Sequence, residues 1–202
     1  VGVFKALGLK DLEVNVNNVG CKECRPKIRE QLKEFLGKNL GQLCVDCQKR
    51  FKQNPLRVFD CKNKHCKEIL KGHSGLTTAL CKDCQGHHAA VLGYLDILDL
   101  KYTSNPALVR GLDYYTKTVF EVISKDLGAQ DAVCGGGRYD NLVEELGGPV
   151  IPAVGFAFGM ERTVMVLEKQ NIKPPSRGLK KIFFALLGEK VRHKLLPIMA
   201  VL

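Results

Sequence analysis

The chain has 202 residues, of which 45% are hydrophobic and 26% charged, a composition typical of a folded globular protein that excludes intrinsic disorder. No apolar run approaches the roughly 18 to 20 residues that a membrane helix needs, and Val1 to Lys10 lacks the layout of a signal peptide. We therefore expect a cytoplasmic protein with no membrane partner. The formal net charge of +10 favours a polyanionic partner such as RNA, although charge informs about association and not about fold.

The first twenty residues are predicted to form the end of a helix and then a strand. Val3 to Leu9 (VFKALGL) is typical of the last turns of a helix that ends near Gly8. Leu12, Val14 and Val16 then alternate with polar residues, as in a strand. A domain seldom begins with the last turns of a helix, so we expect the chain to be an internal piece of a longer protein.

Residues 21–100 form a charged segment that carries eight of the nine cysteines. In a reducing cytoplasm, closely spaced cysteine pairs indicate metal ligands and not disulfides. The first two pairs make C-x2-C-x19-C-x2-C, which predicts one four-thiolate zinc site, and the last two predict a second. The ligands in these two predicted sites are, in order, Cys21, Cys24, Cys44 and Cys47, then Cys61, Cys66, Cys81 and Cys84, with His65, His73, His87 and His88 as substitutes in the second.

Charge in this segment supports the metal interpretation. It holds 15 Lys and Arg against 9 Asp and Glu, and surplus cations lower the pKa of neighbouring thiols. The alternative is that the cysteines are small buried apolar residues in a helical segment. A metal held by four protein ligands would be structural, because it leaves no open position for chemistry.

Helices are predicted on both sides of the cysteine pairs. Arg25 to Leu36 has apolar residues on one face and charges elsewhere, and Gly37 is expected to end it. NPLRVFD at Asn54 to Asp60 predicts a turn into a short extended piece, and His87 to Leu100 a second helix. The lysines and arginines of the segment could meet phosphates, but for any single lysine a solvated helix face is the simpler interpretation.

Three motifs after residue 100 predict a polar site on a sheet. In LVRGLDYYTKTVFE, at Leu108 to Glu121, an arginine, a glycine turn and two tyrosines precede a β-branched and aromatic run. GGGRYD at Gly135 to Asp140 supplies glycines that allow another segment or a ligand to approach the backbone closely. GFAFGMER at Gly155 to Arg162 is a glycine-rich strand that leads into a helix carrying an arginine.

These three motifs, in this order, resemble those of histidyl-tRNA synthetases, and the resemblance runs from about Val3 to the C-terminus. It implies an α+β fold: part of a class II synthetase antiparallel sheet with flanking helices, interrupted by a mainly helical cysteine-rich insertion, and followed by the first β-α unit of an α/β anticodon-binding domain. The expected parts are residues 1–20 and 101–173 for the catalytic core, 21–100 for the insertion, and 174–202 for the linker and the start of the anticodon-binding domain. The dimer-forming motif 1 and motif 2 of the family are expected before Val1.

The resemblance also implies the chemistry. The family activates histidine with ATP and magnesium to histidyl-adenylate and transfers it to tRNA(His), and its full-length members form homodimers. Arg110 would be the catalytic residue, placing its guanidinium on the α-phosphate, because phosphoryl chemistry needs fixed positive charge where the oxygens gain negative charge. Histidine-binding residues would be Arg110, Leu112, Tyr114, Tyr115 and Tyr139, and ATP-binding residues Arg110, Gly159 and Arg162. No P-loop motif occurs, which leaves the class II mode of ATP binding.

Two other functions stay open at this point. One is a non-catalytic synthetase-like regulatory or histidine-sensing domain, which would keep the fold and lose parts of the site. The other is a zinc-stabilised RNA-binding module in which the insertion is the working part. The intact RGLDYY and GGGRYD motifs favour the ligase, because drift would be expected there first. The piece alone is expected to be inactive, because motifs 1 and 2 would be missing.

Overall fold

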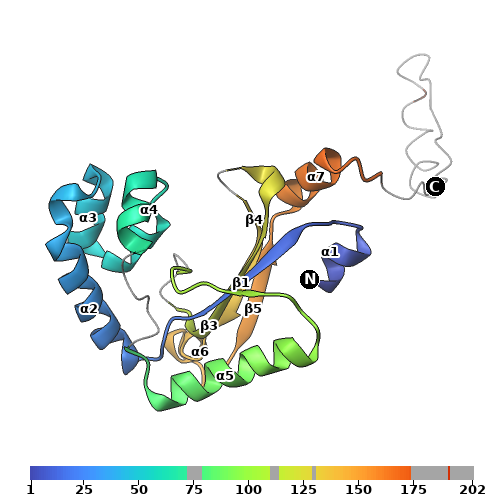
Figure 1. Cartoon of the computed structure of the whole chain (residues 1–202). Helices are drawn as coiled ribbons and strands as arrows, with labels where there is room; N and C mark the ends of the chain where they lie inside the picture. The colour runs from blue at the N-terminus through green and yellow to red at the C-terminus, as the bar shows by residue number, and fades with distance from the viewer. Residues whose placement is uncertain (72–78, 110–113, 129–130, 174–190, 192–202) are drawn as a thin grey trace. The chain divides into compact units, whose positions relative to one another are not determined.

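The computed structural model describes residues 1–71, 79–109, 114–128, 131–173 and 191 (Figure 1). The chain divides into two compact units, Val1–Ile172 and Lys173–Leu202. The first unit is an α+β structure built on a five-stranded sheet, which confirms the predicted fold class at that level. The β-α unit predicted within residues 174–202 lies outside the described residues, apart from position 191.

The sheet has the strand order β2-β1-β3-β4-β5. Its strands are β1 (Leu12–Asn18), β2 (Thr103–Ser104), β3 (Thr116–Ser124), β4 (Ala132–Arg138) and β5 (Val154–Phe158). β1, β3, β4 and β5 pair antiparallel, and the two-residue β2 joins β1 in parallel. The whole cysteine-rich segment is therefore an excursion of the chain between β1 and β2.

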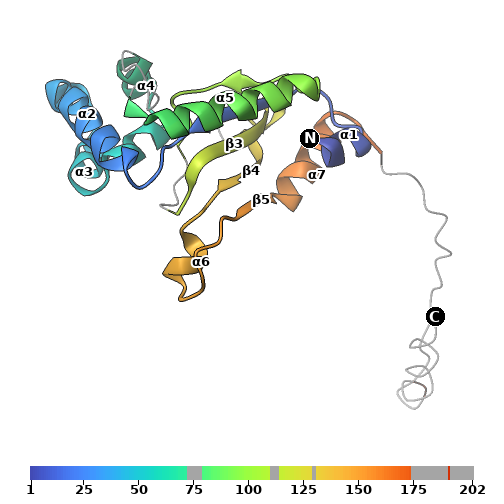
Figure 2. The same cartoon turned by 90° about the horizontal axis from the view of Figure 1, so that it is seen from below.

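The helices are α1 (Gly2–Ala6), α2 (Cys24–Lys38), α3 (Val45–Gln53), α4 (Lys64–Lys71), α5 (Lys82–Ile97), α6 (Leu142–Glu145) and α7 (Met160–Lys169), with 3₁₀ turns at Leu40–Gln42, Pro55–Asp60 and Lys125–Leu127. Both views show α2, α3 and α4 grouped together, and Figure 2 shows α5 alongside the sheet, where it contacts β1 and β3 (Figures 1 and 2). Along the part of the chain that the structure describes, we find no helix long and apolar enough to span a membrane.

The pairing register divides the side chains of the sheet into two contrasting faces. In two cross-strand rows, the residues are Val16, Phe120, Gly136 and Phe156, and then Val14, Val122, Cys134 and Phe158. Two further rows alternate with these, and their residues are Asn17, Val119, Gly137 and Gly155, and then Asn15, Glu121, Gly135 and Ala157. Because directly paired residues point to the same side, one face is apolar and aromatic, and the other is small and polar.

The helix predicted at Arg25 to Leu36 is confirmed as α2, which begins one residue earlier and ends two residues later than expected. Ile28, Leu32 and Leu36 lie on its buried face, at spacings that put them on one side of a helix, and Gly37 falls inside α2. Gly8 follows the short α1 with φ +83°, the left-handed conformation expected of a glycine after a helix.

One local prediction in the insertion is wrong, and the second predicted helix is confirmed as α5 with shifted bounds. Asn54–Asp60 does not become extended: Pro55 opens a 3₁₀ turn, and the Asn54 side chain accepts a hydrogen bond from the Leu56 N–H. The asparagine caps the turn, and proline fits its first position because it has no N–H to satisfy. The second helix begins at Lys82, before the predicted His87, because its first turn follows directly from Cys81.

Candidate functional site

Three tyrosine rings gather where β3 begins and β4 ends. The ring centroids of Tyr114 and Tyr115 are 4.7 Å apart, and Tyr139 lies 5.6 Å from the first and 6.2 Å from the second, nearly edge-on to both. Tyr115 is buried against Leu108 and Val119. The structure thus brings together three of the side chains that the motifs predicted for one pocket, from segments 24 residues apart in the sequence.

Two glycines make room for these rings. A side chain at Gly137 would meet the Tyr115 ring at 2.8 Å, and one at Gly155 would meet the Tyr139 hydroxyl at 2.1 Å. The two glycines are cross-strand partners, so the tyrosines lie over the small and polar face of the sheet. The motifs predicted close approach at glycine. The structure shows that the Tyr139 ring approaches Gly155, and that the Tyr115 ring and the Thr118 carbonyl approach Gly137.

Buried asparagines at the end of β1 support this region, and sequence reasoning missed them. The Asn17 side chain donates to the carbonyls of Pro106 and Leu108 at 3.3 and 2.9 Å, and its Oδ1 has no hydrogen-bond partner among the described residues. The Asn18 side chain donates to the Cys84 carbonyl at 2.8 Å. Asparagine is uncommon in strands, so the pair NN in LEVNVNN was the available signal.

The remaining predicted site residues fall into two groups. Arg110 and Leu112 lie outside the described residues. Gly159 is the N-cap residue of α7, and Arg162, in the first turn of that helix, donates to the Ala132 carbonyl at 2.8 Å. Arg138, the last residue of β4, forms an ion pair with Asp140 at 2.7 Å.

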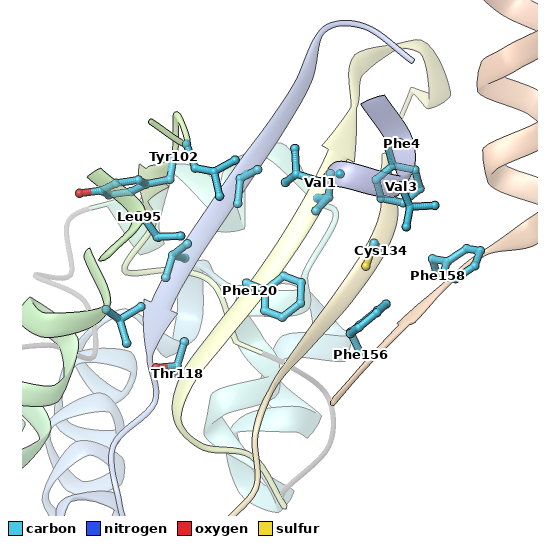
Figure 3. A pocket seen from close by; sticks show the side chains of 16 residues that line it. Val1, Val3, Phe4, Leu95, Tyr102, Thr118, Phe120, Cys134, Phe156 and Phe158 are labelled. Carbon is cyan, nitrogen blue, oxygen red and sulfur yellow. The ribbon is translucent and has the colours of Figure 1, made fainter. Parts of the chain in front are cut away.

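Each face of the sheet carries a cavity. On the small and polar face, a cavity of about 680 Å³ is lined by Asn15, Glu121, Asp131 and the segment Asn105 to Val109, among others. On the apolar face, a cavity of about 560 Å³ lies between the sheet, α1 and α5 (Figure 3). Figure 3 shows Phe120 and Phe156 on this apolar side, and the buried Cys134 also lines the cavity. The polar cavity is the one suited to a charged substrate, because its walls offer amide and carboxylate groups.

The eight cysteines form two compact groups of sulfur atoms, but not in the predicted combination. The outer cluster is Cys21, Cys24, Cys81 and Cys84, and the inner cluster is Cys44, Cys47, Cys61 and Cys66. Within each cluster all sulfurs lie within 4.8 Å of one another, and all eight thiols are free. The prediction that neighbouring pairs share a site is therefore wrong. The chain folds back on itself, so the first pair meets the last pair and the two middle pairs meet each other.

Histidines take no part in these clusters among the described residues. His87 instead shares a hydrogen bond of 2.8 Å with the Thr118 hydroxyl on β3, and His65 is exposed. His73 lies outside the described residues. Each cluster is therefore an all-thiol set, as the four-cysteine spacing predicted, even though the grouping differs.

The two C-x2-C pairs that open α3 and α5 share an electrostatic pattern. The backbone N–H of Cys47 lowers the pKa of the Cys44 thiol to about 7, and that of Cys84 does the same for Cys81. Burial raises the pKa of the second thiol in each pair, Cys47 and Cys84. The first cysteine of each pair is thus readily deprotonated at a helix N-terminus, where backbone N–H groups favour negative charge.

The fold and site define a class of protein. An antiparallel sheet with flanking helices, a cluster of tyrosines over glycines, and a glycine-rich strand leading into an arginine-bearing helix form the arrangement of class II aminoacyl-tRNA synthetases. Comparison with known proteins narrows the class. The model of the histidyl-tRNA synthetase family matches residues 58–163, and the chain belongs to this family.

Relatives in this family are similar over nearly the whole chain. The histidine–tRNA ligase of Clostridium botulinum (strain Hall) is 44% identical over 198 residues, which cover 98% of this chain and 47% of the relative. That of Caldanaerobacter subterraneus subsp. tengcongensis is 47% identical over 190 residues, 94% of this chain and 46% of the relative. The apo S. aureus histidyl-tRNA synthetase has a similar structure, with a TM-score of 0.67 and 32% identity over 98% of this chain and 49% of that chain. The chain spans about half the length of the relatives it matches.

Proposed function

We propose that the chain supplies the later part of the catalytic domain of a histidine–tRNA ligase. The carboxylate of histidine would attack the α-phosphorus of ATP, the bond to pyrophosphate would break, and histidyl-adenylate would form. A ribose hydroxyl of the terminal adenosine of tRNA(His) would then attack the activated carbonyl and release AMP. The observation that carries this proposal is the cluster of three tyrosines over the glycines of β4 and β5, in a chain that belongs to the synthetase family.

Histidine recognition is assigned to Tyr114, Tyr115 and Tyr139, with Arg110 and Leu112 from the same motif. A phenol can donate to one form of an imidazole nitrogen and accept from the other. Tyr115 is the most buried of the three and packs against Leu108 and Val119, which supports a role in shaping the wall of the pocket. Tyr114 and Tyr139 are partly exposed, so their hydroxyls are the more accessible partners for the ring.

ATP binding is assigned to Arg110, Gly159 and Arg162. Arg110 would stabilise the charge that builds on the α-phosphate, because arginine offers a permanently charged planar fork. Arg162 would reach the γ-phosphate from the first turn of α7, giving up its contact with the Ala132 carbonyl. Magnesium binds mainly to phosphate, water and carboxylate oxygens. The carboxylates of Glu121 and Asp131, which line the polar cavity, would hold the magnesium ion that accompanies ATP.

Several further points belong to the proposal. Its partners are histidine, ATP and tRNA(His), in the cytoplasm, and the working enzyme is a homodimer. Residues 21–100 are an insertion in a catalytic core made of residues 1–20 and 101–173, and residues 174–202 begin the anticodon-binding domain. Structural zinc, proposed for the two cysteine clusters, is independent of the ligase reaction.

The proposal is tested with a chimera in which this chain replaces the matching half of the Clostridium botulinum ligase. The assay is histidine-dependent exchange of pyrophosphate with ATP, followed by charging of tRNA(His). We expect both activities in the chimera. A folded, dimeric chimera that binds histidine but catalyses no exchange would identify the chain as a non-catalytic, histidine-sensing relative and would overturn the proposal.

A further inference from the structure

We propose that residues 21–100 hold two structural zinc ions in nested pairing, one in the outer cluster (Cys21, Cys24, Cys81 and Cys84) and one in the inner cluster (Cys44, Cys47, Cys61 and Cys66), and that the outer ion fixes the start of β3 below the tyrosine pocket.

Distances between the sulfur atoms carry the first part. In a tetrahedral site with zinc–sulfur bonds of about 2.3 Å, the sulfurs lie about 3.8 Å apart. In the outer cluster, the sulfur of Cys21 lies 3.6 Å from that of Cys24 and 4.0 Å from that of Cys81, and the sulfurs of Cys24 and Cys84 are 3.8 Å apart. In the inner cluster, the sulfurs of Cys44 and Cys61 are also 3.8 Å apart. A disulfide bond is about 2.05 Å long, so these separations match a shared metal and not a disulfide.

The chemistry of the ligands selects zinc and a structural role. Four thiolates in a tetrahedron suit zinc, and hard cations such as Mg²⁺ and Ca²⁺ take oxygen ligands instead. Cys24, Cys84, Cys47 and Cys66 are at most 1% exposed, so solvent reaches little of either cluster. Two four-thiolate zinc sites carry four negative charges, and the segment has six more Lys and Arg than Asp and Glu to balance them. With four protein ligands, neither ion keeps a position for a substrate.

In the nested pairing the two zinc sites stabilise different parts of the insertion. The inner cluster belongs to the core of the insertion itself, where Cys47, Cys61 and Cys66 pack with Leu32, Leu36 and neighbouring apolar residues. The outer cluster joins the first cysteine of the segment to the last, where the chain leaves β1 and where α5 starts back towards the sheet. It has its own small core, in which Cys24 and Cys84 pack with Ile28 and Leu80. The outer ion would therefore close the base of the insertion.

Residues next to the outer cluster hold the first residues of β3. The Asn18 side chain donates to the Cys84 carbonyl at 2.8 Å, and the guanidinium of Arg25 donates to the Tyr115 carbonyl. Asp83 pairs with Lys117 at 2.8 Å, and His87 shares a hydrogen bond with Thr118. In the part of the chain that the structure describes, the hydrogen bonds of the inner cluster's cysteines lie within the insertion, for example from the Asn63 N–H to the Cys61 sulfur. The outer cluster is therefore the one connected to the pocket.

The strained backbone of Lys117, at the start of β3, needs surrounding contacts to hold it. Lys117 has φ +53°, in the left-handed region that a residue with a side chain rarely adopts, and the register of β3 shifts between Thr116 and Val119. Its N–H donates to the Gly20 carbonyl and its carbonyl accepts from the Val19 N–H, both immediately before Cys21. Such a conformation persists only where surrounding contacts hold it. By fixing residues 19–25 and 81–87, the outer ion would hold the backbone directly after Tyr115. The importance of the outer ion for histidine binding rests on the proposed function.

Metal stoichiometry of the purified 202-residue chain tests the sites. We expect two zinc ions per chain by elemental analysis, released by a thiol-modifying mercurial. Cys134→Ser is the matched control, because this buried cysteine lies on β4, away from both clusters, and this variant should keep two ions. A chain that folds with less than about half an ion would overturn the proposal.

Double variants test the pairing. Cys24→Ser with Cys84→Ser removes two ligands of one site under nested pairing, so one ion should remain, whereas Cys24→Ser with Cys47→Ser should remove both. Pairing in sequence order predicts the reverse. The unmodified chain supplies a second measurement if a variant fails to fold: its cadmium form should give two ¹¹³Cd resonances with cysteine β-proton couplings that group the outer and inner cysteines separately. Couplings that group Cys24 with Cys47 would contradict the proposal.

Hydrogen exchange tests the connection to the pocket without any enzymatic assay. Loss of the outer ion through Cys24→Ser and Cys84→Ser should speed amide exchange at residues 115–119 by at least tenfold. Loss of the inner ion through Cys44→Ser and Cys61→Ser should speed exchange in residues 28–70 and leave 115–119 unchanged. Equal protection of residues 115–119 in both variants would refute the proposal that the outer ion fixes the start of β3. It would not contradict the two zinc sites or the ligase proposal, so the three claims can fail separately.

Discussion

Replacing Gly155 by alanine is a small change aimed at the hydroxyl of Tyr139. The added methyl carbon would lie 2.1 Å from that oxygen, whereas ordinary contact begins at about 3.4 Å, so the hydroxyl must move by about 1.3 Å. The nearest atoms to the new carbon all belong to the Tyr139 ring, so we expect the ring to yield and the strand pairing to survive.

The kinetic effect follows from this displacement. A misplacement of about 1 Å in a positioning group can cost about 10²-fold in rate or affinity. In the chimera with the Clostridium botulinum ligase, Gly155→Ala should therefore lower kcat/KM for histidine in pyrophosphate exchange by about 10²-fold. The KM for histidine should rise, and that for ATP should change little, because the displaced group is assigned to the imidazole.

Gly93→Ala provides the control. Gly93 lies in α5, and a side chain there would meet nothing within 4 Å. Alanine in a helix interior is more stable than glycine by about 0.5 to 1 kcal/mol, so this variant should melt slightly higher and keep full activity. The reasoning is refuted if Gly155→Ala folds normally and its KM for histidine equals that of the parent chimera.

Two further predictions concern charge. Arg110→Ala in the chimera should slow adenylate formation by about 10³- to 10⁵-fold in single-turnover experiments, and should slow the transfer of histidine from preformed adenylate much less. Arg110→Lys should restore the rate of adenylate formation only partly. Equal losses in both steps would assign Arg110 to binding or structure. Burial and the nearby cations of Arg138 and Lys117 lower the pKa of His87, so the folded state favours the neutral imidazole. The stability that the neutral His87 contributes is therefore present above about pH 6.5, the usual pKa of an unfolded histidine. It is lost as the pH falls through the lower pKa of the folded state. His87→Gln should therefore reduce the drop in denaturation midpoint between pH 7.5 and pH 5.5, and an unchanged drop would refute this assignment.

Local patterns in the sequence were sufficient where a single periodicity or motif determined the outcome. α2 was predicted because Ile28, Leu32 and Leu36 repeat at helical spacing over about two turns. α3 and α4 were not predicted: they have nine and eight residues, too short for a clear repeat. The tyrosine pocket was predicted from its motifs, which keep Tyr114, Tyr115 and Tyr139 in recognisable contexts.

Long-range features could not be read from spacing. Nothing in the intervals between cysteines tells which pair meets which, because the return of the chain through α3, α4 and α5 decides it. The strained Lys117 is likewise set by tertiary contacts, with Gly20, Val19 and Asp83. The division of the sheet into an apolar and a small, polar face needed the register of all four long strands, which the sequence of any one strand does not specify.

The central claim is that the tyrosine pocket reads the ring nitrogens of histidine. It is tested most directly by comparing histidine with thienylalanine, whose five-membered ring has nearly the same size but no nitrogen. A site built to hydrogen-bond its substrate rejects an analogue lacking those atoms by about 10⁴-fold or more, whereas a merely apolar pocket discriminates by only about 10 to 200-fold. We predict a ratio of kcat/KM in pyrophosphate exchange by the chimera of about 10⁴ or more in favour of histidine. A ratio near 10² would show that the tyrosines only pack against the ring and would contradict the assignment.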